Sequence, residues 1–377
     1  MSPRGRDRVG DAAILLLVVG LPLLGAALAG RDLHTFFRFP PPLEIPSDYP
    51  RFSWLAAAAV VAALILVARP LAAGWRSRST RGAVAEKSGD KSPGGKTPFP
   101  WWGWGALGWT LLWWAIAWQR GTELAGIRRF TFFPLWLGFI VSANACVQRR
   151  TGSCLMRRDP GVWLALFGVS ACFWWLFEWL NRFVHNWHYL GVSDFGPLAY
   201  ALHASLCFST VLPAVAAVAE ALGSPAPAAT RFATGPRWTW LEHAGAGFAL
   251  LIAGAATLLC VGAWPRGFYF ALWIAPLAMF LGKDMVAGHR GPASEIARGD
   301  WSRAATWMIA ALVCGFFWEL WNGQSWPKWI YTVPGVERWH VFEMPLLGYS
   351  GYLPFGLECL IVVDRLKACV TKRSLRG

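Results

Sequence analysis

Charged residues are scarce in this chain. Asp, Glu, Lys and Arg make up 15% of its 377 residues and 55% of the residues are hydrophobic, whereas soluble domains carry about 25% charged residues. This balance excludes an ordinary soluble domain. The formal net charge is +14, but the basic residues cluster in short segments between apolar runs. Such clustering indicates a membrane orientation signal, and we expect no nucleic-acid partner.

Motifs for metals, nucleotides and activated nucleophiles are also missing. No CxxC occurs, and most of the eight cysteines lie in apolar runs, which excludes a disulfide framework and a zinc site. His185 and His188 have the spacing of two metal ligands, but no third ligand stands nearby. No P-loop, GxGxxG, HExxH or GxSxG pattern lies in a suitable context. We therefore expect neither a metal nor a cofactor.

Long apolar runs dominate what is present. Ten segments are apolar enough to be drawn as spans: 12–29, 52–68, 101–118, 130–147, 161–181, 197–222, 240–262, 268–287, 303–322 and 341–364. Basic residues are richest in alternate loops and in the C-terminal tail. The positive-inside rule then places both termini in the cytoplasm, in a protein of a bacterial inner membrane type. The first run ends in Ala27-Leu28-Ala29, so retention and cleavage as a signal peptide both stay open.

These segments predict an all-α, polytopic integral membrane protein in four parts. Residues 1–73 hold two N-terminal transmembrane helices. Residues 74–99, rich in Ser, Gly and basic side chains, have the composition of a disordered cytoplasmic linker. Residues 100–223 and 238–368 each hold four spans.

The two four-span units share a pattern at an offset of 137 to 142 residues. Both contain ExxN followed by WxY, and the matched residues are Glu178, Asn181, Trp187 and Tyr189 with Glu319, Asn322, Trp329 and Tyr331. An even number of spans gives both units the same orientation, so we predict parallel repeats around a pseudo-two-fold axis along the membrane normal. Chance matching, favoured by the 26 tryptophans, is the alternative.

Acids inside apolar segments are the candidate functional residues. Glu319 and Asn322 are three apart and share a helix face, so a buried Glu319 could hold a proton while Asn322 orients it. The alternative is a structural hydrogen bond between a helix end and a loop. Glu178 and Asn181 form the matching pair, which we interpret as supporting. Function is placed in the second unit because its last span carries Glu343 and Glu358, whereas the first unit has His203 and Ala217 near the matching places and Glu220 one turn later.

The last span, 341–364, carries Glu343 and Glu358. The residues between them include several helix breakers, namely Pro345, Gly348, Gly351, Pro354 and Gly356. Broken backbone survives at membrane depth where it is buried in protein or lines a cavity. The segment therefore predicts a polar cavity, with a kinked helix that packs closely through its glycines as the alternative.

Aromatic residues surround these acids in the sequence. Candidates for a binding wall are Trp318, Trp329, Tyr331, Tyr349 and Tyr352, with Trp187 and Tyr189 in the first unit. Their π faces could stabilise a carbocation or stack on a polyene. The alternative is an interfacial aromatic belt, because Trp and Tyr favour that depth in any membrane protein.

Residues 316–358 resemble the membrane-embedded lycopene cyclases, which are small helical domains used in tandem or as heterodimers. The resemblance lies in Trp318-Glu319, in Trp329-Ile330-Tyr331 with Pro334, and in Glu343 with Pro345. The paired acids that the family carries beside a proline are absent. The resemblance implies a cofactor-free, proton-initiated cyclisation or isomerisation of an isoprenoid, such as a carotenoid, inside the bilayer.

Three functions remain open at this point. The first is an enzyme for an apolar isoprenoid or lipid substrate, with Glu319, Asn322, Glu343 and Glu358 as catalytic residues. The second is a transporter or channel with a polar path through broken helices. The third is a non-catalytic structural or lipid-binding membrane protein. All three have the bilayer as a partner, and the sequence leaves the oligomeric state and the substrate open.

Overall fold

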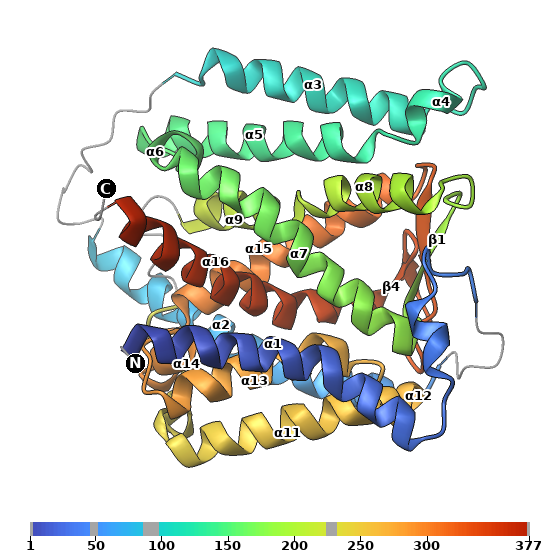
Figure 1. The fold of residues 1–377 in the computed structure, drawn as a ribbon. Helices are drawn as coiled ribbons and strands as arrows, with labels where there is room; N and C mark the ends of the chain where they lie inside the picture. The colour runs from blue at the N-terminus through green and yellow to red at the C-terminus, as the bar shows by residue number, and fades with distance from the viewer. Residues whose placement is uncertain (1–2, 46–51, 86–97, 224–231, 375–377) are drawn as a thin grey trace.

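The structure of the chain is a computed structural model that describes residues 3–45, 52–85, 98–223 and 232–374. It is mostly helical (Figure 1). Long helices occur at all ten places where spans are predicted. They are α1 (Pro3–Leu28), α2 (Trp54–Ala85), α3 (Trp101–Trp118), α5 (Phe132–Thr151), α7 (Pro160–Val184), α8 (Pro197–Phe208) followed by α9 (Val211–Gly223), α11 (Ala244–Ala263), α13 (Ala271–Val286), α15 (Ser302–Asn322) and α16 (Tyr352–Ser374).

Six segments of the described chain are long and apolar enough to cross a membrane. They are Val9–Leu28, Pro160–Val184, Pro197–Gly223, Ala244–Ala263, Ser302–Asn322 and Leu346–Val370. A seventh segment, Trp54–Arg69, is apolar but shorter. Both chain ends lie at one end of the bundle and the strands lie at the other (Figure 1). We call these the terminal end and the strand end.

Short elements connect the long helices. The helical ones are η1 (Leu33–Phe37), α4 (Ala125–Arg128), α6 (Leu155–Arg158), η3 (Thr239–Glu242), α12 (Pro265–Phe268), α14 (Pro292–Ala297) and η4 (Leu346–Gly351). The strands are β1 (Trp187–Leu190), β2 (Lys328–Tyr331), β3 (His340–Val341) and β4 (Met344–Pro345), in two antiparallel pairs, β1 with β2 and β3 with β4. The all-helical prediction therefore missed these four short strands.

Local sequence explains where the two ExxN helices begin. Asp159 precedes α7 and its side chain accepts a hydrogen bond from the Val162 amide at 3.0 Å, with Pro160 at the first helical position. Asp300 precedes α15 and accepts from the Ser302 amide at 2.9 Å. Both helices then run to the strand end, where their last turns carry the ExxN residues. The caps therefore set which residues reach that end.

Helices of the two units pack in matching combinations. Helix α3 packs on α5 and α11 packs on α13, while α7 packs on α9 and α15 packs on α16. The units also exchange contacts, because α15 packs on α9 and α16 on α7. One hydrophobic core runs through both units and includes the fully buried Trp136, Leu212 and Phe355. The two units therefore share a core instead of folding as separate bodies.

Glycines bring α1 and α11 into backbone contact. A Cβ atom on Gly262 would lie 1.8 Å from the Pro22 carbonyl oxygen, and one on Gly25 would lie 1.9 Å from the Leu259 carbonyl oxygen. Such approach is the usual way in which helices associate without a hydrophobic driving force. The N-terminal helix is therefore held against the second unit by its glycines.

Substituting Gly262 tests this contact. We expect Gly262→Ala to push α1 away from α11. The free energy of unfolding of the detergent-solubilised protein should fall by about 2 kcal/mol, as overpacking does elsewhere, and its melting temperature should fall with it. The matched control is Gly20→Ala in α1, because nothing lies within 4 Å of a Cβ atom there. Equal melting temperatures for Gly262→Ala and Gly20→Ala would contradict the contact.

Two parts of the chain differ from the sequence-based expectation. Helix α2 continues to Ala85, so residues 74–85 of the predicted disordered linker are helical, and residues 86–97 lie outside the described residues. The final helix begins at Tyr352, not near 341, because residues 340–345 pair as β3 and β4 and η4 follows. Pro354 thus falls in the first turn of α16, where a missing backbone donor breaks no helical bond.

Candidate functional site

A large cavity lies between the two units toward the strand end. Its volume is about 690 Å³, within the range of sites that bind small organic molecules. Its walls come from α2, α8, α13, α15 and α16 and from both strands of the β1–β2 pair. Apolar and aromatic side chains make up most of the wall. The sequence predicted a cavity near η4, and Gly348, Ser350 and Gly351 do line it, but the predicted polar character is wrong.

Helix α2 supplies one side of the cavity. The lining residues are Leu55, Ala56, Ala59, Val60, Ala63, Leu64 and Val67. From Ala56 on, these positions recur every three or four residues and so form one stripe of the helix. Helix α2 packs against η4, and this stripe faces the cavity. In a bilayer, the side of the cavity would therefore be closed by a single helix with small side chains.

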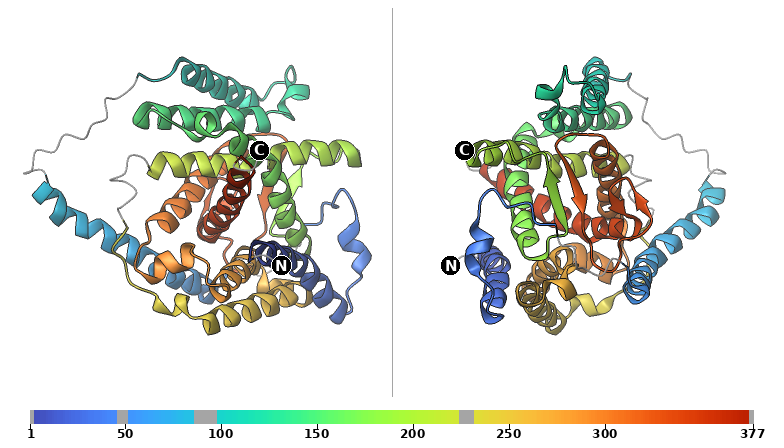
Figure 2. Two further views of the ribbon diagram at one scale, coloured as in Figure 1. Left: turned by 60° about the vertical axis from the view of Figure 1, so that its left-hand side comes forward. Right: turned by 90° about the vertical axis from the view of Figure 1, so that its right-hand side faces the viewer.

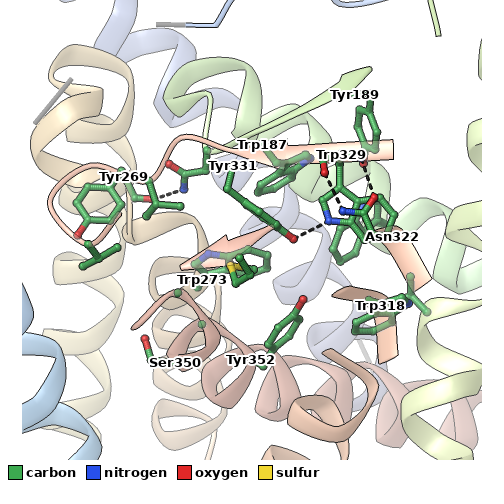
Figure 3. Close-up of a pocket in the computed structure, with 18 of the residues that line it drawn as sticks. Trp187, Tyr189, Tyr269, Trp273, Trp318, Asn322, Trp329, Tyr331, Ser350 and Tyr352 are labelled. Atoms are coloured by element: carbon green, nitrogen blue, oxygen red, sulfur yellow. Dashed lines mark hydrogen bonds between the residues drawn. The ribbon is translucent and has the colours of Figure 1, made fainter. Parts of the chain in front are cut away.

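Aromatic side chains form the opposite wall (Figure 3). Trp329 and Tyr331 project from β2, Tyr352 from α16, Trp318 from α15 and Trp273 from α13, and all five line the cavity. Tyr331 and Tyr352 point toward one another from opposite sides of this wall (Figure 3). The wall thus presents ring faces together with two phenolic hydroxyl groups.

Glu319 lies directly behind this aromatic wall and is fully buried. Its Oε1 atom accepts hydrogen bonds from Tyr331 Oη at 2.6 Å and Tyr352 Oη at 3.0 Å, with Trp329 Nε1 at 3.5 Å. Its Oε2 atom is buried without a hydrogen-bond partner. Because Oε1 already accepts from both tyrosines, a proton on this carboxyl group belongs on Oε2.

Asn322 holds the backbone of Trp329 in place. Its Oδ1 atom accepts from the Trp329 amide at 2.8 Å, and its Nδ2 atom donates to the Trp329 carbonyl at 2.7 Å. One side chain thus satisfies both backbone groups of a strand residue, as a neighbouring strand would. Asn322 also lines the cavity, so its position fixes the adjacent aromatic wall.

The first unit contains the same arrangement at an offset of 141 or 142 residues. Glu178 Oε1 accepts from Trp187 Nε1 at 3.0 Å, Tyr189 Oη at 2.6 Å and Trp174 Nε1 at 2.9 Å. Asn181 accepts from the Trp187 amide at 3.3 Å and donates to its carbonyl at 2.8 Å. The ExxN and WxY motifs therefore form one structural unit in each half, an acid–aromatic cluster beside an amide clamp.

Strands β1 and β2 join the two clusters side by side. They pair antiparallel, with Trp187 opposite Tyr331 and Tyr189 opposite Trp329. Figure 2 shows this pair from the strand end, at the centre of the surrounding helices. Each Trp therefore faces the Tyr of the other half, which is the exchange of positions that a two-fold axis between the strands would produce.

One difference separates the two acid clusters. The third donor to Glu178 is Trp174, one turn earlier on the same helix, whereas the third donor to Glu319 is Tyr352 on a different helix. The position in α15 that matches Trp174 is Gly315, where a Cβ atom would lie 2.4 Å from the Tyr352 ring. Glycine at this point admits Tyr352, which brings α16 into the second cluster.

His188 also lies in β1 and connects the strand pair to the preceding loop. Thr332 Oγ1 donates to the His185 carbonyl at 2.6 Å, so it accepts from His188 Nε2 at 2.8 Å and His188 carries its proton on Nε2. Burial of this side chain, followed by the charge of His185, lowers the pKa of His188 from 6.5 to about 4. The fold therefore holds His188 neutral.

This pKa shift predicts acid sensitivity. Because the unfolded chain binds a proton near pH 6.5 and the folded chain only near 4, the stability contributed by neutral His188 is present above pH 6.5 and is lost as pH falls toward 4. We expect a loss of about 2 kcal/mol between pH 7 and pH 5. Thermal unfolding of wild type and His188→Gln across this range checks it, and parallel pH curves for the two proteins would contradict it.

The structure brings some predicted site residues to the cavity and leaves others away from it. Of the candidate wall residues, Tyr349 alone does not line the cavity, and its hydroxyl group donates to the Val341 carbonyl at 3.1 Å. Among the four predicted catalytic residues, Asn322 is the one that lines it. Glu343 lies in the turn between β3 and β4 and forms an ion pair with Lys328.

Glu358, like Glu343, does not line the cavity. It belongs to α16 and is 4% exposed. Within the described chain, neither of its carboxyl oxygens has a hydrogen-bond partner. Glu319, also predicted as catalytic, does not line the cavity either. Glu343 instead pairs with Lys328 in the turn before η4, and the carboxyl group of Glu319 lies behind Tyr331 and Tyr352.

Several cavity residues were missed by the sequence reasoning. Trp174, Tyr269 and Trp273 line the cavity, as do Arg128 and Arg129. The spacing of Trp174 and Glu178, four residues apart on one helix, could have identified that contact, since such pairs are neighbours. The remaining four come from connecting segments and a neighbouring helix, and no local pattern marks them.

Comparison of the chain with known protein families, with curated protein sequences and with solved structures finds no match in any of the three.

Proposed function

We propose that this chain is an intramembrane enzyme that takes an elongated apolar substrate, of the isoprenoid or lipid class, into the cavity and isomerises or cyclises it by proton transfer. The observation that carries the proposal is the aromatic-walled cavity, in which the hydroxyl groups of Tyr331 and Tyr352 connect the wall to the buried Glu319. The resemblance of residues 316–358 to the lycopene cyclases points the same way.

Proton transfer is assigned to Glu319 and its two tyrosines. A carboxyl group held in apolar surroundings is costly to ionise and retains its proton for delivery. The proton on Oε2 is the one available, because Oε1 accepts from Tyr331 and Tyr352. Ring faces of Trp318, Trp329 and Trp273 are positioned to stabilise positive charge that develops on an alkene. Asn322 is a positioning residue through Trp329, and Glu178 with Asn181 supports the wall from the first unit.

Non-catalytic lipid binding is the second candidate. It is favoured by one observation, which is that the carboxyl group of Glu319 does not line the cavity. Proton delivery requires Tyr331 or Tyr352 to move aside, whereas binding requires no movement. A transporter for polar solutes is disfavoured, because the cavity wall is mostly apolar.

The cavity assignment is tested by filling it. We expect a photoactivatable isoprenoid analogue to label β2 and α16 of the purified protein, and Val60→Trp to reduce this labelling severalfold, because Val60 lines the cavity. Val61→Trp is the matched control, since Val61 is exposed and does not line it. Equal labelling in both variants, or labelling spread over the outer helices, would contradict the proposed function.

We also propose that all ten long helices cross the membrane as two parallel repeats after two N-terminal helices, with both chain ends in the cytoplasm. The matching packing of helices and the reciprocal β1–β2 register support this arrangement. Reporter fusions after residues 152 and 370 should then report cytoplasm, and a fusion at residue 325 should report the outside. A cytoplasmic signal at 325 would overturn both the ten-span topology and the parallel repeats.

A further inference from the structure

The charged residues that line the cavity all have the same sign. Arg128, Arg129 and Lys328 are in its wall, whereas no Asp or Glu of the described chain lines it. A cavity with apolar walls and exclusively basic charges is poorly suited to a neutral hydrocarbon along its whole length. The charges instead call for a ligand that carries negative charge at one end.

These three cations differ in how well they are compensated. Lys328 forms an ion pair with Glu343, and Arg129 pairs with Asp194 at 3.3 Å, whose side chain is 69% exposed. Arg128 has no carboxylate partner among the described residues, and its Nε atom is buried without a hydrogen-bond acceptor. Because no carboxylate of the described chain compensates its charge, the part of Arg128 that lines the cavity could pair with an anion bound there.

The position of Arg128 also suits an anionic group. Arg128 ends helix α4, which lies at the strand end of the bundle (Figure 1). The apolar stripe of α2 and Tyr352 of α16 lie along other parts of the same cavity. The cavity therefore has basic residues at one end and apolar residues along the rest. This arrangement is complementary to an amphiphile with an anionic headgroup and a hydrocarbon chain.

We propose that Arg128 and Arg129 bind the phosphate headgroup of an amphiphile whose hydrocarbon chain occupies the apolar body of the cavity. Both arginines line the cavity, and a guanidinium group matches phosphate because it can donate paired hydrogen bonds to the phosphate oxygens. This inference rests on the proposed function and names its substrate class as a phosphorylated isoprenoid or phospholipid. Asp194 then acts as the exposed counter-ion that Arg129 leaves when the headgroup binds.

Four probes test the proposal in the detergent-solubilised full chain. Binding of farnesol, farnesyl phosphate, phosphatidic acid and inorganic phosphate is measured by calorimetry or native mass spectrometry. We expect farnesyl phosphate to bind at least about tenfold more tightly than farnesol, since charge-assisted hydrogen bonds to phosphate oxygens are strong. Arg128→Gln should remove this advantage while leaving farnesol affinity unchanged, and Arg128→Lys should retain part of it. Arg298→Gln, an exposed basic residue in another connecting segment, should change nothing.

The outcomes separate this inference from the proposed function. Equal affinities for farnesol and farnesyl phosphate, unaffected by Arg128→Gln, would overturn the headgroup site and leave the cavity function standing. Failure of every chain-bearing probe to bind would remove the proposed function itself. If inorganic phosphate binds as tightly as farnesyl phosphate, the site is one for a free anion, and the proposal of an amphiphilic ligand is wrong. Preference for phosphatidic acid would identify a phospholipid, and preference for farnesyl phosphate an isoprenoid, as the source of the phosphate.

Discussion

Replacing Glu319 by alanine is expected to destabilise the folded protein by about 4 kcal/mol. The substitution removes the acceptor of Tyr331 and Tyr352, and each buried hydroxyl group left without a partner costs about 1–3 kcal/mol. The space vacated by the side chain adds the cost of a cavity. Glu242→Ala, on an exposed residue, is expected to change stability by less than about 0.5 kcal/mol.

Glu319→Gln separates the structural role from the chemical one. An amide oxygen can still accept from both tyrosines, so we expect most of the stability and the binding of ligand to remain. The amide has no acidic proton, so product formation from an isoprenoid substrate should be abolished. Thermal unfolding, ligand binding and product analysis are measured on the same preparations, with Glu178→Gln in parallel and expected to have the smaller effect. Retained turnover in Glu319→Gln would assign proton transfer to another acid, whereas ligand binding without product formation in the wild type would favour the lipid-binding alternative.

Asn322→Ala is expected to have a comparably large effect, about 3 kcal/mol, by a different route. The Trp329 amide and carbonyl both lose their partner, and unpaired backbone groups are costly in a buried setting. Trp329 then leaves its position in the cavity wall, so ligand affinity should fall together with stability.

Two comparisons check the role of Asn322. Asn181→Ala should lose a similar amount of stability, because it breaks the matching clamp on Trp187, but should affect ligand affinity less. Gln324→Ala, two residues away and exposed, should be silent. A fully stable Asn322→Ala protein, measured by unfolding in detergent, would show that the clamp contributes little.

The sequence predicted the structure best where the informative pattern is local. Apolar runs gave helices in the right places, and ExxN and WxY marked residues that do lie together, because three-residue spacing on a helix and two-residue spacing on a strand each define a face. It failed at residues 340–351. There, Pro345 and the glycines indicated a broken helix, whereas β3, β4 and η4 use them for turns before α16 begins.

Long-range partners could not be read from the chain. Glu343 carries a charge inside an apolar segment, which favoured a catalytic role, but its pairing with Lys328 depends on how β2 meets the β3–β4 turn. Tyr352 reaches Glu319 only because Gly315 leaves room, and nothing in either local sequence predicts that contact. The same holds for Arg128, whose connection to the cavity depends on where α4 packs.

The β1–β2 register shows which residues lie opposite each other at the proposed two-fold axis between the two units. His188 lies opposite Ile330, and these positions match at the repeat offset of 142 residues. In an assembly of two identical chains, a residue at the symmetry axis must face its own copy, so a histidine there would meet a histidine. Here a buried histidine lies opposite an aliphatic side chain, and Glu319 accepts from Tyr352 where Glu178 accepts from Trp174. The asymmetry of the cavity is thus one that two identical units could not have.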